Sequence, residues 1–415
     1  MSLQTSITQK NQSIFDSQVL FDSFTEKRSW EPSWLVDYRR KHWDVLNNFP
    51  QRLPKDEGWR FSNRSRFGFS KVHKLEESAG SMNLKYKSSP GTRFDSFEKM
   101  ILDRPDELLT YIDASGPNLG AKESFHLIAS FANSGFFLKT GNSNDQTQTF
   151  RASHILPSKS SATFHRNIIA LEPFTEAILF ETINSNDWNS SALLGNFTQV
   201  ELGEGAKLKR VLVQSCNPFS TLHQLEHFQI GKNASLTNVT IHLGSSQSRV
   251  ETKGTLLGEG AEFENFSLFL GQDNQLFDQR TMQHHIAPHG RSNLVCKNAL
   301  SNESKSIFSG MIKVDNSAIS TDAYQSNRNL LLSNKAEADS LPGLEILANE
   351  VKCSHGATTS RIDQGELFYL LARGIPRPAA EKLIALGFFE EIIEKIGVEN
   401  EIESIRKKIE FKFES

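Results

Sequence analysis

The strongest structural signal in the chain is the stretch Leu202-Gly203-Glu204-Gly205-Ala206-Lys207-Leu208. A similar stretch begins 28 residues later, at Ile230-Gly231-Lys232-Asn233-Ala234-Ser235-Leu236, and another after a further 27, at Leu257-Gly258-Glu259-Gly260-Ala261-Glu262-Phe263. The spacing continues, with weaker similarity, at Ile286-Ala287-Pro288-His289-Gly290 and Val314-Asp315-Asn316-Ser317-Ala318. A fixed period of small-residue turns between apolar strands indicates a solenoid, in which each coil buries its apolar face against its neighbours.

A parallel β-helix is the solenoid that these coils predict. Short apolar runs such as Val211-Leu212-Val213 and Phe266-Ser267-Leu268-Phe269-Leu270 alternate with polar turns from about residue 120 to about residue 345, where strong helical patterns are largely missing. Glycine suits the corner of a coil because it adopts positive φ without a steric penalty. The alternative is a β-sandwich whose turns resemble one another by chance.

Helical patterns replace the repeats at both ends of the chain. Before the repeats, one helix is expected to begin near Pro32, and a second helical stretch is expected over 96–112, interrupted near Pro105. The sequence therefore predicts an N-terminal helical domain over residues 1–118, followed by the β-helix core over 119–355.

A C-terminal helical domain is expected over residues 356–415. Asp363-Gln364-Gly365-Glu366 resembles a capping box that opens its first helix, and Gly374 stands where a helix commonly ends. The next helix is expected to end near Gly387, and two isoleucine-rich helical patterns follow it. Such helices either dock a partner or pack on the open end of the solenoid.

Composition and charge exclude several classes of protein. The 415 residues include 46 Lys and Arg against 49 Asp and Glu, and the formal net charge of −3 argues against a nucleic-acid binder. No apolar run approaches the ~18 residues of a membrane span, and the N-terminus lacks a secretory signal pattern. Three scattered cysteines fit a reducing compartment, so a cytoplasmic protein is expected.

Several histidines are poor candidates for a metal site. His223 and His227 are four residues apart, which corresponds to ~13 Å on a strand and is too far to share a metal. His284, His285 and His289 cluster beside a turn, where ordinary surface or core roles are favoured. The sequence also lacks a phosphate loop, a nucleophile elbow and zinc-finger spacing.

The most suggestive pair of ligand-type residues is Cys353 and His355. They are two residues apart, so on a strand both side chains project from the same face. A thiolate and an imidazole together suit iron, zinc or copper. Two ligands do not complete a metal site, so further ligands would have to come from elsewhere, such as another chain. The alternative is an inert buried cysteine beside a hydrogen-bonded histidine.

The C-terminal part of the chain resembles the SufB/SufD family of iron–sulfur cluster assembly proteins. Leu341-Pro342-Gly343-Leu344-Glu345-Ile346, Cys353-Ser354-His355-Gly356-Ala357-Thr358 and Leu367-Phe368-Tyr369-Leu370-Leu371-Ala372-Arg373-Gly374-Ile375 follow one another as in that family. Asn327-Arg328-Asn329-Leu330-Leu331-Leu332-Ser333 and Glu57-Gly58-Trp59-Arg60 are similar to it as well. The resemblance implies a mainly β fold, a right-handed parallel β-helix (solenoid) core flanked by N-terminal and C-terminal α-helical domains, in agreement with the repeats.

Within that family the chain is most like the SufD members. SufB-like chains are usually longer and carry His-Glu-Ala where this chain has His355-Gly356-Ala357. They also have a scaffold cysteine in the neighbourhood that Ser326-Asn327-Arg328-Asn329 occupies here. The resemblance therefore implies a non-catalytic subunit of the SUF scaffold complex, not an enzyme, which pairs with a SufB-like protein through the β-helix.

The resemblance also implies a cargo and its ligands. A transient iron–sulfur cluster would form at the interface with the SufB-like partner, facing His355 with Cys353 beside it, and none would be bound to the isolated chain. The resemblance also allows a reduced flavin in the complex. A homodimer is allowed when the SufB-like partner is absent.

A SufC-like ABC-type ATPase is the second partner that the resemblance implies. It would dock on the C-terminal helices, and the candidate contacts are Phe368, Tyr369, Arg373, Gly374 and Ile375. Packing of these residues within their own domain is the alternative.

A different class of function remains open from the fold alone. A β-helix can carry acid–base residues in a groove, as in a carbohydrate-active enzyme such as a polysaccharide lyase or hydrolase. Glu251, Glu262 and Glu264 lie in the repeat region but form no evident constellation, and the missing secretory signal counts against this reading.

Overall fold

The computed structural model describes residues 17–49, 56–68, 74–76, 82–87, 89–141, 147–156 and 161–414. The N-terminal region contains five α-helices in the described residues, namely α1 (Gln18–Glu26), α2 (Ser33–Asn47), α3 (Phe97–Asp103), α4 (Pro105–Ile112) and α5 (Lys122–Phe131). Two 3-10 turns, Glu57–Trp59 and Arg64–Phe67, lie between α2 and α3. The C-terminal region contains α6 (Gln364–Ala372), α7 (Arg377–Ile393) and α8 (Glu399–Glu414).

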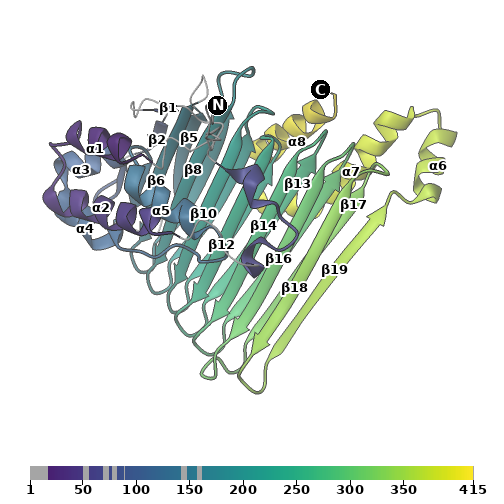
Figure 1. Ribbon diagram of the computed structural model, residues 1–415. Helices are drawn as coiled ribbons and strands as arrows, with labels where there is room; N and C mark the ends of the chain where they lie inside the picture. Colours follow the sequence, from purple (N-terminus) through teal and green to yellow (C-terminus); the bar gives the residue numbers. More distant parts are fainter. Residues whose placement is uncertain are drawn as a thin grey trace, which may run out of the picture.

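A β-solenoid of about 7 turns forms the centre of the molecule, which confirms the expected β-helix (Figure 1). Each turn gives one strand to each of two sheets. In spatial order, sheet A consists of β18 (Glu337–Ile346), β16 (Lys305–Val314), β14 (Leu276–His285), β12 (Gln247–Leu256), β10 (Thr221–Ile230), β8 (Ala192–Leu202), β6 (Ser161–Leu171), β4 (Phe136–Lys139) and β3 (Arg93–Ser96), with β1 (Lys74–Leu75) beside β6.

Sheet B faces sheet A across the interior of the solenoid. Its strands, in spatial order, are β19 (Lys352–Arg361), β17 (Asp322–Leu331), β15 (Arg291–Leu300), β13 (Glu262–Gly271), β11 (Ser235–His242), β9 (Lys207–Ser215), β7 (Glu176–Ser185), β5 (Gln148–Leu156) and β2 (Met82–Tyr86). Pairing is parallel along both sheets, except that β2 pairs with β5 and β3 with β4 in antiparallel orientation.

The corners that lead from sheet A to sheet B stack on one another through backbone hydrogen bonds. Gly205 N–H donates to the carbonyl of Lys232 (2.8 Å), and Asn233 N–H donates to that of Glu259 (2.9 Å). In each described turn one corner residue has positive φ, and these residues are Phe174, Gly205, Asn233, Gly260, His289, Ser320 and Glu350. Glycine therefore holds two of these corners, and at Phe174, Asn233, His289 and Ser320 a hydrogen bond from the backbone N–H to the next coil offsets the cost of the left-handed conformation.

Alternate residues of every strand point into the space between the sheets. Most are apolar, and the interior packs like an ordinary protein core. Among them lies a charged cluster: the buried Arg210 is ion-paired with Glu181 and with Glu226 (2.6 Å), and it also donates to Asn238 (3.1 Å). Burial alone would raise the pKa of Glu181, but Arg210 and His154 outweigh it and lower that pKa to about 2.

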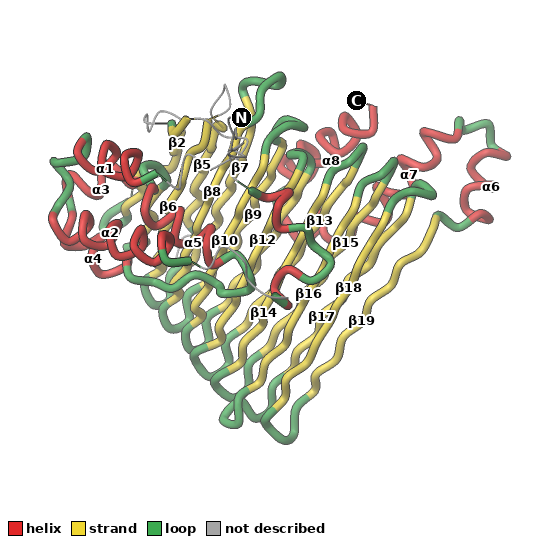
Figure 2. Tube along the Cα trace, viewed as in Figure 1, coloured by secondary structure: helices red, strands yellow, loops and turns green. Residues whose placement is uncertain are grey.

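Helices cover the outer faces of both sheets (Figure 2). Phe125 and Phe131 of α5 pack against apolar side chains of sheet A such as Phe197. On sheet B, α7 and α8 bury their apolar faces, including Phe389 and Ile405, in a cluster that reaches from β7 to β17. Within the described residues, no helix combines the length and apolar composition needed to cross a membrane.

The structure departs from the expected domain boundaries. The region before residue 119 also contains β1, β2 and β3, and a helix that the sequence analysis missed, α5, follows it. The apolar residues of α5 are spaced to form one face of a helix, but the stretch that holds them is short enough to resemble a strand of the repeats. At the other end β19 continues to Arg361, past the boundary expected at 355, because its register with β17 is unbroken.

The C-terminal helices differ from the expectation in two respects. α7 does not end at Gly387 but runs through it to Ile393, so two expected helices are one. The helices also lie along the flank of sheet B, since α7 contacts β13 and β15, and do not cap the open end of the solenoid. The expected N-cap is confirmed, because the Asp363 side chain accepts from the N–H groups of Gly365 and Glu366.

The continuity of α7 can be tested at Gly387. Replacing Gly387 with alanine should raise the free energy of unfolding by about 0.5–1 kcal/mol, because alanine favours a helix interior and its methyl group would meet nothing within 4 Å. Gly260→Ala should instead lower it by about 1–2 kcal/mol, because φ is +68° there and the new methyl would approach Asn233. Urea unfolding measures both; a destabilised Gly387→Ala variant would mean that the helix ends at that residue.

Candidate functional site

Cys353 and His355 lie on β19, the last strand of sheet B. In the register of the sheet Cys353 is beside Ala323 and His355 beside Gln325, both of which are buried in the interior. The two side chains therefore belong to the inner face of the final coil, as their spacing predicts. Cys353 is partly buried against the apolar cluster of that coil, whereas His355 is exposed.

This final coil is the open end of the solenoid. β18 pairs only with β16, and β19 only with β17, so each has one edge without a neighbouring strand in the described residues. Most residues of both strands are exposed or partly exposed, in contrast to the buried strands before them. Two ten-residue edges with free backbone groups form a surface on which further strands can pair.

The three cysteines of the chain have different access to solvent. Cys216 and Cys296 are buried, and burial raises the pKa of the Cys216 thiol to about 12 and that of Cys296 further still. The pKa of Cys353 is also raised, first by burial and then by Asp322, while a hydrogen bond to the backbone of Ala323 opposes the shift. Cys353 is the cysteine that a partner or a metal can reach.

The pair does not form a complete metal site within this chain. In the described part of the structure, no three His, Cys, Asp or Glu side chains converge as metal ligands would. Any metal held by Cys353 and His355 would need ligands from another molecule, which is the arrangement that the sequence left open.

His223 and His227 have ordinary hydrogen-bond partners. His223 contacts the hydroxyl of Ser124 and the carbonyl of Phe67, both at 2.9 Å. His227 contacts the carbonyl of Ser115 at 2.9 Å, and burial lowers the pKa of both histidines, that of His223 to about 4. They hold the N-terminal region against sheet A.

The carboxylates considered for an enzyme do not converge. Glu251 lies on the outer face of sheet A, where it accepts from the N–H groups of Leu119 (3.0 Å) and Ala121 (2.7 Å). Glu262 and Glu264 belong to sheet B, on the opposite side of the solenoid. These three residues therefore form no acid–base pair.

The candidate docking residues lie on and after α6, which projects from the solenoid (Figure 1). Phe368 is 71% exposed and Tyr369 54% exposed. Only Leu367 of that helix is buried. The guanidinium of Arg373 lies 3.5 Å from the centre of the Tyr369 ring.

An apolar groove separates α6 from α7. It has a volume of about 540 Å³ and is lined by Tyr369, Leu370, Leu383 and Ile384 with the start of α6. Gly374, at φ +79°, ends α6 and turns the chain, and Ile375 packs on the main C-terminal cluster instead of lining the groove. Of the five candidate docking residues, Phe368, Tyr369 and Arg373 are thus exposed. Gly374 forms a turn, and Ile375 packs within the C-terminal region.

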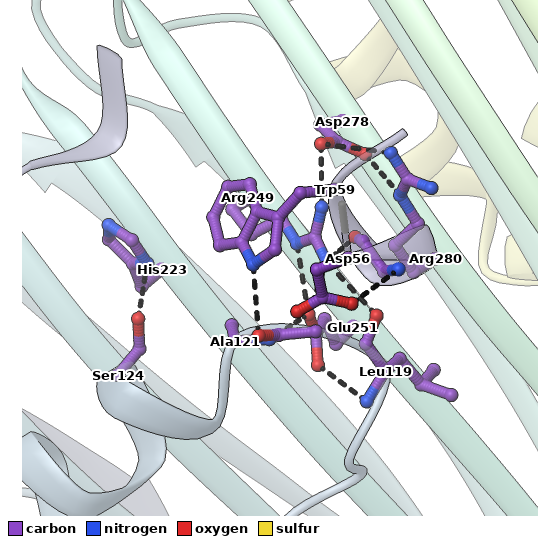
Figure 3. A network of polar contacts seen from close by, with 12 residues as sticks. Asp56, Trp59, Leu119, Ala121, Ser124, His223, Arg249, Glu251, Asp278 and Arg280 are labelled. Atoms are coloured by element: carbon purple, nitrogen blue, oxygen red, sulfur yellow. Dashed lines mark hydrogen bonds and ion pairs between the residues drawn. The ribbon is translucent and has the colours of Figure 1, made fainter. Parts of the chain in front are cut away.

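A buried network explains the Glu57-Gly58-Trp59-Arg60 motif, whose structural role the sequence did not reveal (Figure 3). Trp59 lies over the guanidinium of Arg249, 4.2 Å from it, and donates its indole N–H to the carbonyl of Gly120 (3.0 Å). Arg249 donates to the carbonyl of Gly58 at 2.7 Å. The motif therefore anchors the N-terminal segment to the outer face of sheet A.

Four buried charges alternate beneath this segment (Figure 3). Arg249 pairs with Glu251 (2.5 Å) and with Asp278 (2.6 Å), and Asp278 also pairs with Arg280 (2.7 Å). Burial would raise the pKa of Asp278, but Arg249 and Arg280 outweigh it, so the pKa lies below its ordinary value. Removal of one carboxylate would leave a buried guanidinium without compensation.

The Asp278→Asn variant tests this network. It should lose about 3–5 kcal/mol of unfolding free energy, since the buried Arg280 then loses its carboxylate partner and Arg249 keeps only Glu251. Because the pKa of Asp278 is depressed in the folded state, its contribution exists above the ordinary value of 3.8 and is lost as the pH falls below it.

Urea unfolding at neutral pH and at low pH would show both effects. Glu262→Gln, at an exposed residue of sheet B, is the matched control and should change stability by less than about 0.5 kcal/mol. An Asp278→Asn variant as stable as the wild type at neutral pH would contradict the assigned role.

Comparison with known proteins identifies the family. The model of the domain described as SUF system FeS cluster assembly, SufBD core domain, matches residues 154–388. An iron–sulfur cluster assembly SufBD family protein of Mycobacterium bovis is 30% identical over 266 residues, covering 62% of this chain and 66% of that protein. The iron–sulfur cluster assembly protein SufD of Escherichia coli is 34% identical over 199 residues, 48% of this chain and 47% of that protein.

A similarity over nearly the full length exists to the SufD of Bacillus subtilis, which is 21% identical over 413 residues, 92% of this chain and 94% of that protein. Across the mycobacterial and E. coli relatives the match spans 46% to 66% of the relative's own length. The family domain covers more than half of the 415 residues and includes β18, β19 and the pair Cys353 and His355. This chain belongs to the SufBD core family of the SUF system of iron–sulfur cluster assembly.

Proposed function

We propose that this chain is a SufD-like, non-catalytic subunit of a cytoplasmic iron–sulfur cluster assembly scaffold. The observation that carries the proposal is the open end of the solenoid, where an exposed His355 and a reachable Cys353 share the inner face of the last coil. The family and the relatives named SufD support the same role.

A SufB-like protein is the proposed partner at this end. The free edges of β18 and β19 suit a second β-helix, whose strands would continue both sheets and complete their hydrogen bonds. Such a partner would also supply the thiolate and carboxylate ligands that this chain does not gather around Cys353 and His355. The iron–sulfur cluster would then be a cargo that forms at the interface between the two chains and is transferred to another protein.

A SufC-like ATPase is the proposed partner of the C-terminal helices. The groove between α6 and α7 presents apolar side chains beside the exposed Phe368 and Tyr369. Aromatic residues and arginine often dominate the energy of protein interfaces, and Arg373 is already held against Tyr369. Nucleotide-dependent motion of the ATPase would reach the solenoid through these helices only if its two states bind them differently.

Replacing His355 with alanine tests the role of the open end. The complex of this chain with its SufB-like and SufC-like partners should lose roughly tenfold or more of its cluster content, since a ligand-shell residue is removed. Iron and acid-labile sulfide are measured after anaerobic purification. Ser354→Ala, on the same strand but on its opposite face, is the matched control and should keep full content.

Measuring the mass of the complex as well distinguishes a variant that no longer assembles with its partners from one that assembles but holds little cluster. The expected result is an intact complex with little cluster. Full cluster content in His355→Ala would refute a ligand role, and a chain that forms no complex with the SufB-like partner would refute the proposed scaffold.

Replacing Tyr369 with alanine tests the ATPase contact. The affinity for the SufC-like protein should fall about tenfold or more, because an exposed aromatic anchor is lost and Arg373 loses the ring on which it stacks. Calorimetry measures the affinity. Phe411→Ala removes an aromatic ring of similar exposure from α8 and should leave binding unchanged, whereas equal losses in both variants would contradict docking at α6.

A further inference from the structure

A second cavity lies far along the solenoid from the open end. It occupies the outer face of sheet B where α8 crosses β2, β5, β7 and β9, and its volume is about 290 Å³. Pockets for small ligands span about 300–1,000 Å³, and this cleft lies at the lower limit of that range, so it admits only a compact molecule.

Three cations line the cleft. Arg151 reaches in from β5, Lys85 from the neighbouring β2 and Lys408 from α8. Arg151 is ion-paired with Glu401 at 2.7 Å. The carboxylate of Glu181 is engaged with Arg210 in the interior, so it does not balance the cations.

Lys408 is the informative member of this set. It is partly buried, and within the described residues no hydrogen bond or ion pair joins its ammonium group to another side chain. Burial lowers the pKa of Lys408, with Glu401 opposing the shift. A partly buried ammonium group without a partner costs stability in the empty protein, and a bound anion would offset that cost.

The floor of the cleft is apolar. Phe180, Val211, Val213 and Ile405 are buried there, and the guanidinium of Arg151 lies 4.7 Å from the centre of the Phe180 ring. The hydroxyl of Ser404 adds a hydrogen-bonding group at the rim. The cleft thus combines an apolar surface with an excess of positive charge.

We infer that this cleft binds a small organic phosphate, a phosphate monoester joined to a compact apolar group. The phosphate dianion would lie between Lys408, Arg151 and Lys85, and the apolar group would contact the part of the apolar floor that faces the cleft. This ligand site is separate from the cluster end and from the α6 groove, so it does not depend on the proposed function.

Calorimetric titration of the full-length protein with phenyl phosphate tests the inference, with inorganic phosphate and benzoate as comparison probes. Phenyl phosphate should bind at least about tenfold more tightly than either, because only it uses both the cations and the apolar floor. Its affinity should fall as salt is added.

Lys408→Met should weaken phenyl phosphate binding about tenfold or more and should leave the melting temperature of the ligand-free protein unchanged or higher. Lys85→Gln, at an exposed residue, should weaken binding several-fold without affecting folding. Lys335→Met, at an exposed lysine paired with Glu303 on a distant corner, is the control and should bind like the wild type.

Absence of phenyl phosphate binding to the wild type would overturn the inference. Unchanged affinity in both Lys408→Met and Lys85→Gln would overturn it as well. Inorganic phosphate that binds as tightly as phenyl phosphate would refute the organic ligand, and a Lys408→Met variant that melts earlier without ligand would mark Lys408 as a structural residue.

Discussion

Stacking of one coil on the next is the constraint on which this structure depends. No coil can bury its apolar face alone, and the corners are held by backbone hydrogen bonds such as that from Gly205 to Lys232. A stack of this kind must end somewhere, and its last coil keeps free strand edges. The access of solvent to Cys353 and His355 follows from that geometry, because the inner face of the final coil has no further coil to cover it.

Buried ion pairs join segments of this fold that are distant in the sequence. Arg210 links the facing sheets in the interior through Glu226, whereas Arg249 and Asp278 hold the segment with Trp59 on the outside of sheet A. Both clusters are buried and almost fully paired, so they lock one arrangement without offering a reactive group. Groups that are reachable and incompletely partnered remain at the last coil, at α6 and in the cleft under α8.

The repeats predicted the β-helix because period and turn composition are local properties, and the spacing of Cys353 and His355 predicted their common face for the same reason. Properties that depend on distant contacts were not predictable. The continuation of α7 through Gly387 is decided by packing on sheet B, and the role of Trp59 requires Arg249, about 190 residues away. The exposure of Phe368 follows from the projection of α6 away from the sheet, which periodicity within one helix does not reveal.

The long apolar contact of α7 and α8 with sheet B has a mechanical consequence. Because this apolar contact reaches strands from β7 to β17, the two helices hold many coils together and oppose shear between them. Only Ile362 and Asp363 separate α6 from β19, and the turn at Gly374 and Pro376 joins α6 to α7, so a load applied to α6 is shared between the last coil and the coils that α7 and α8 hold together.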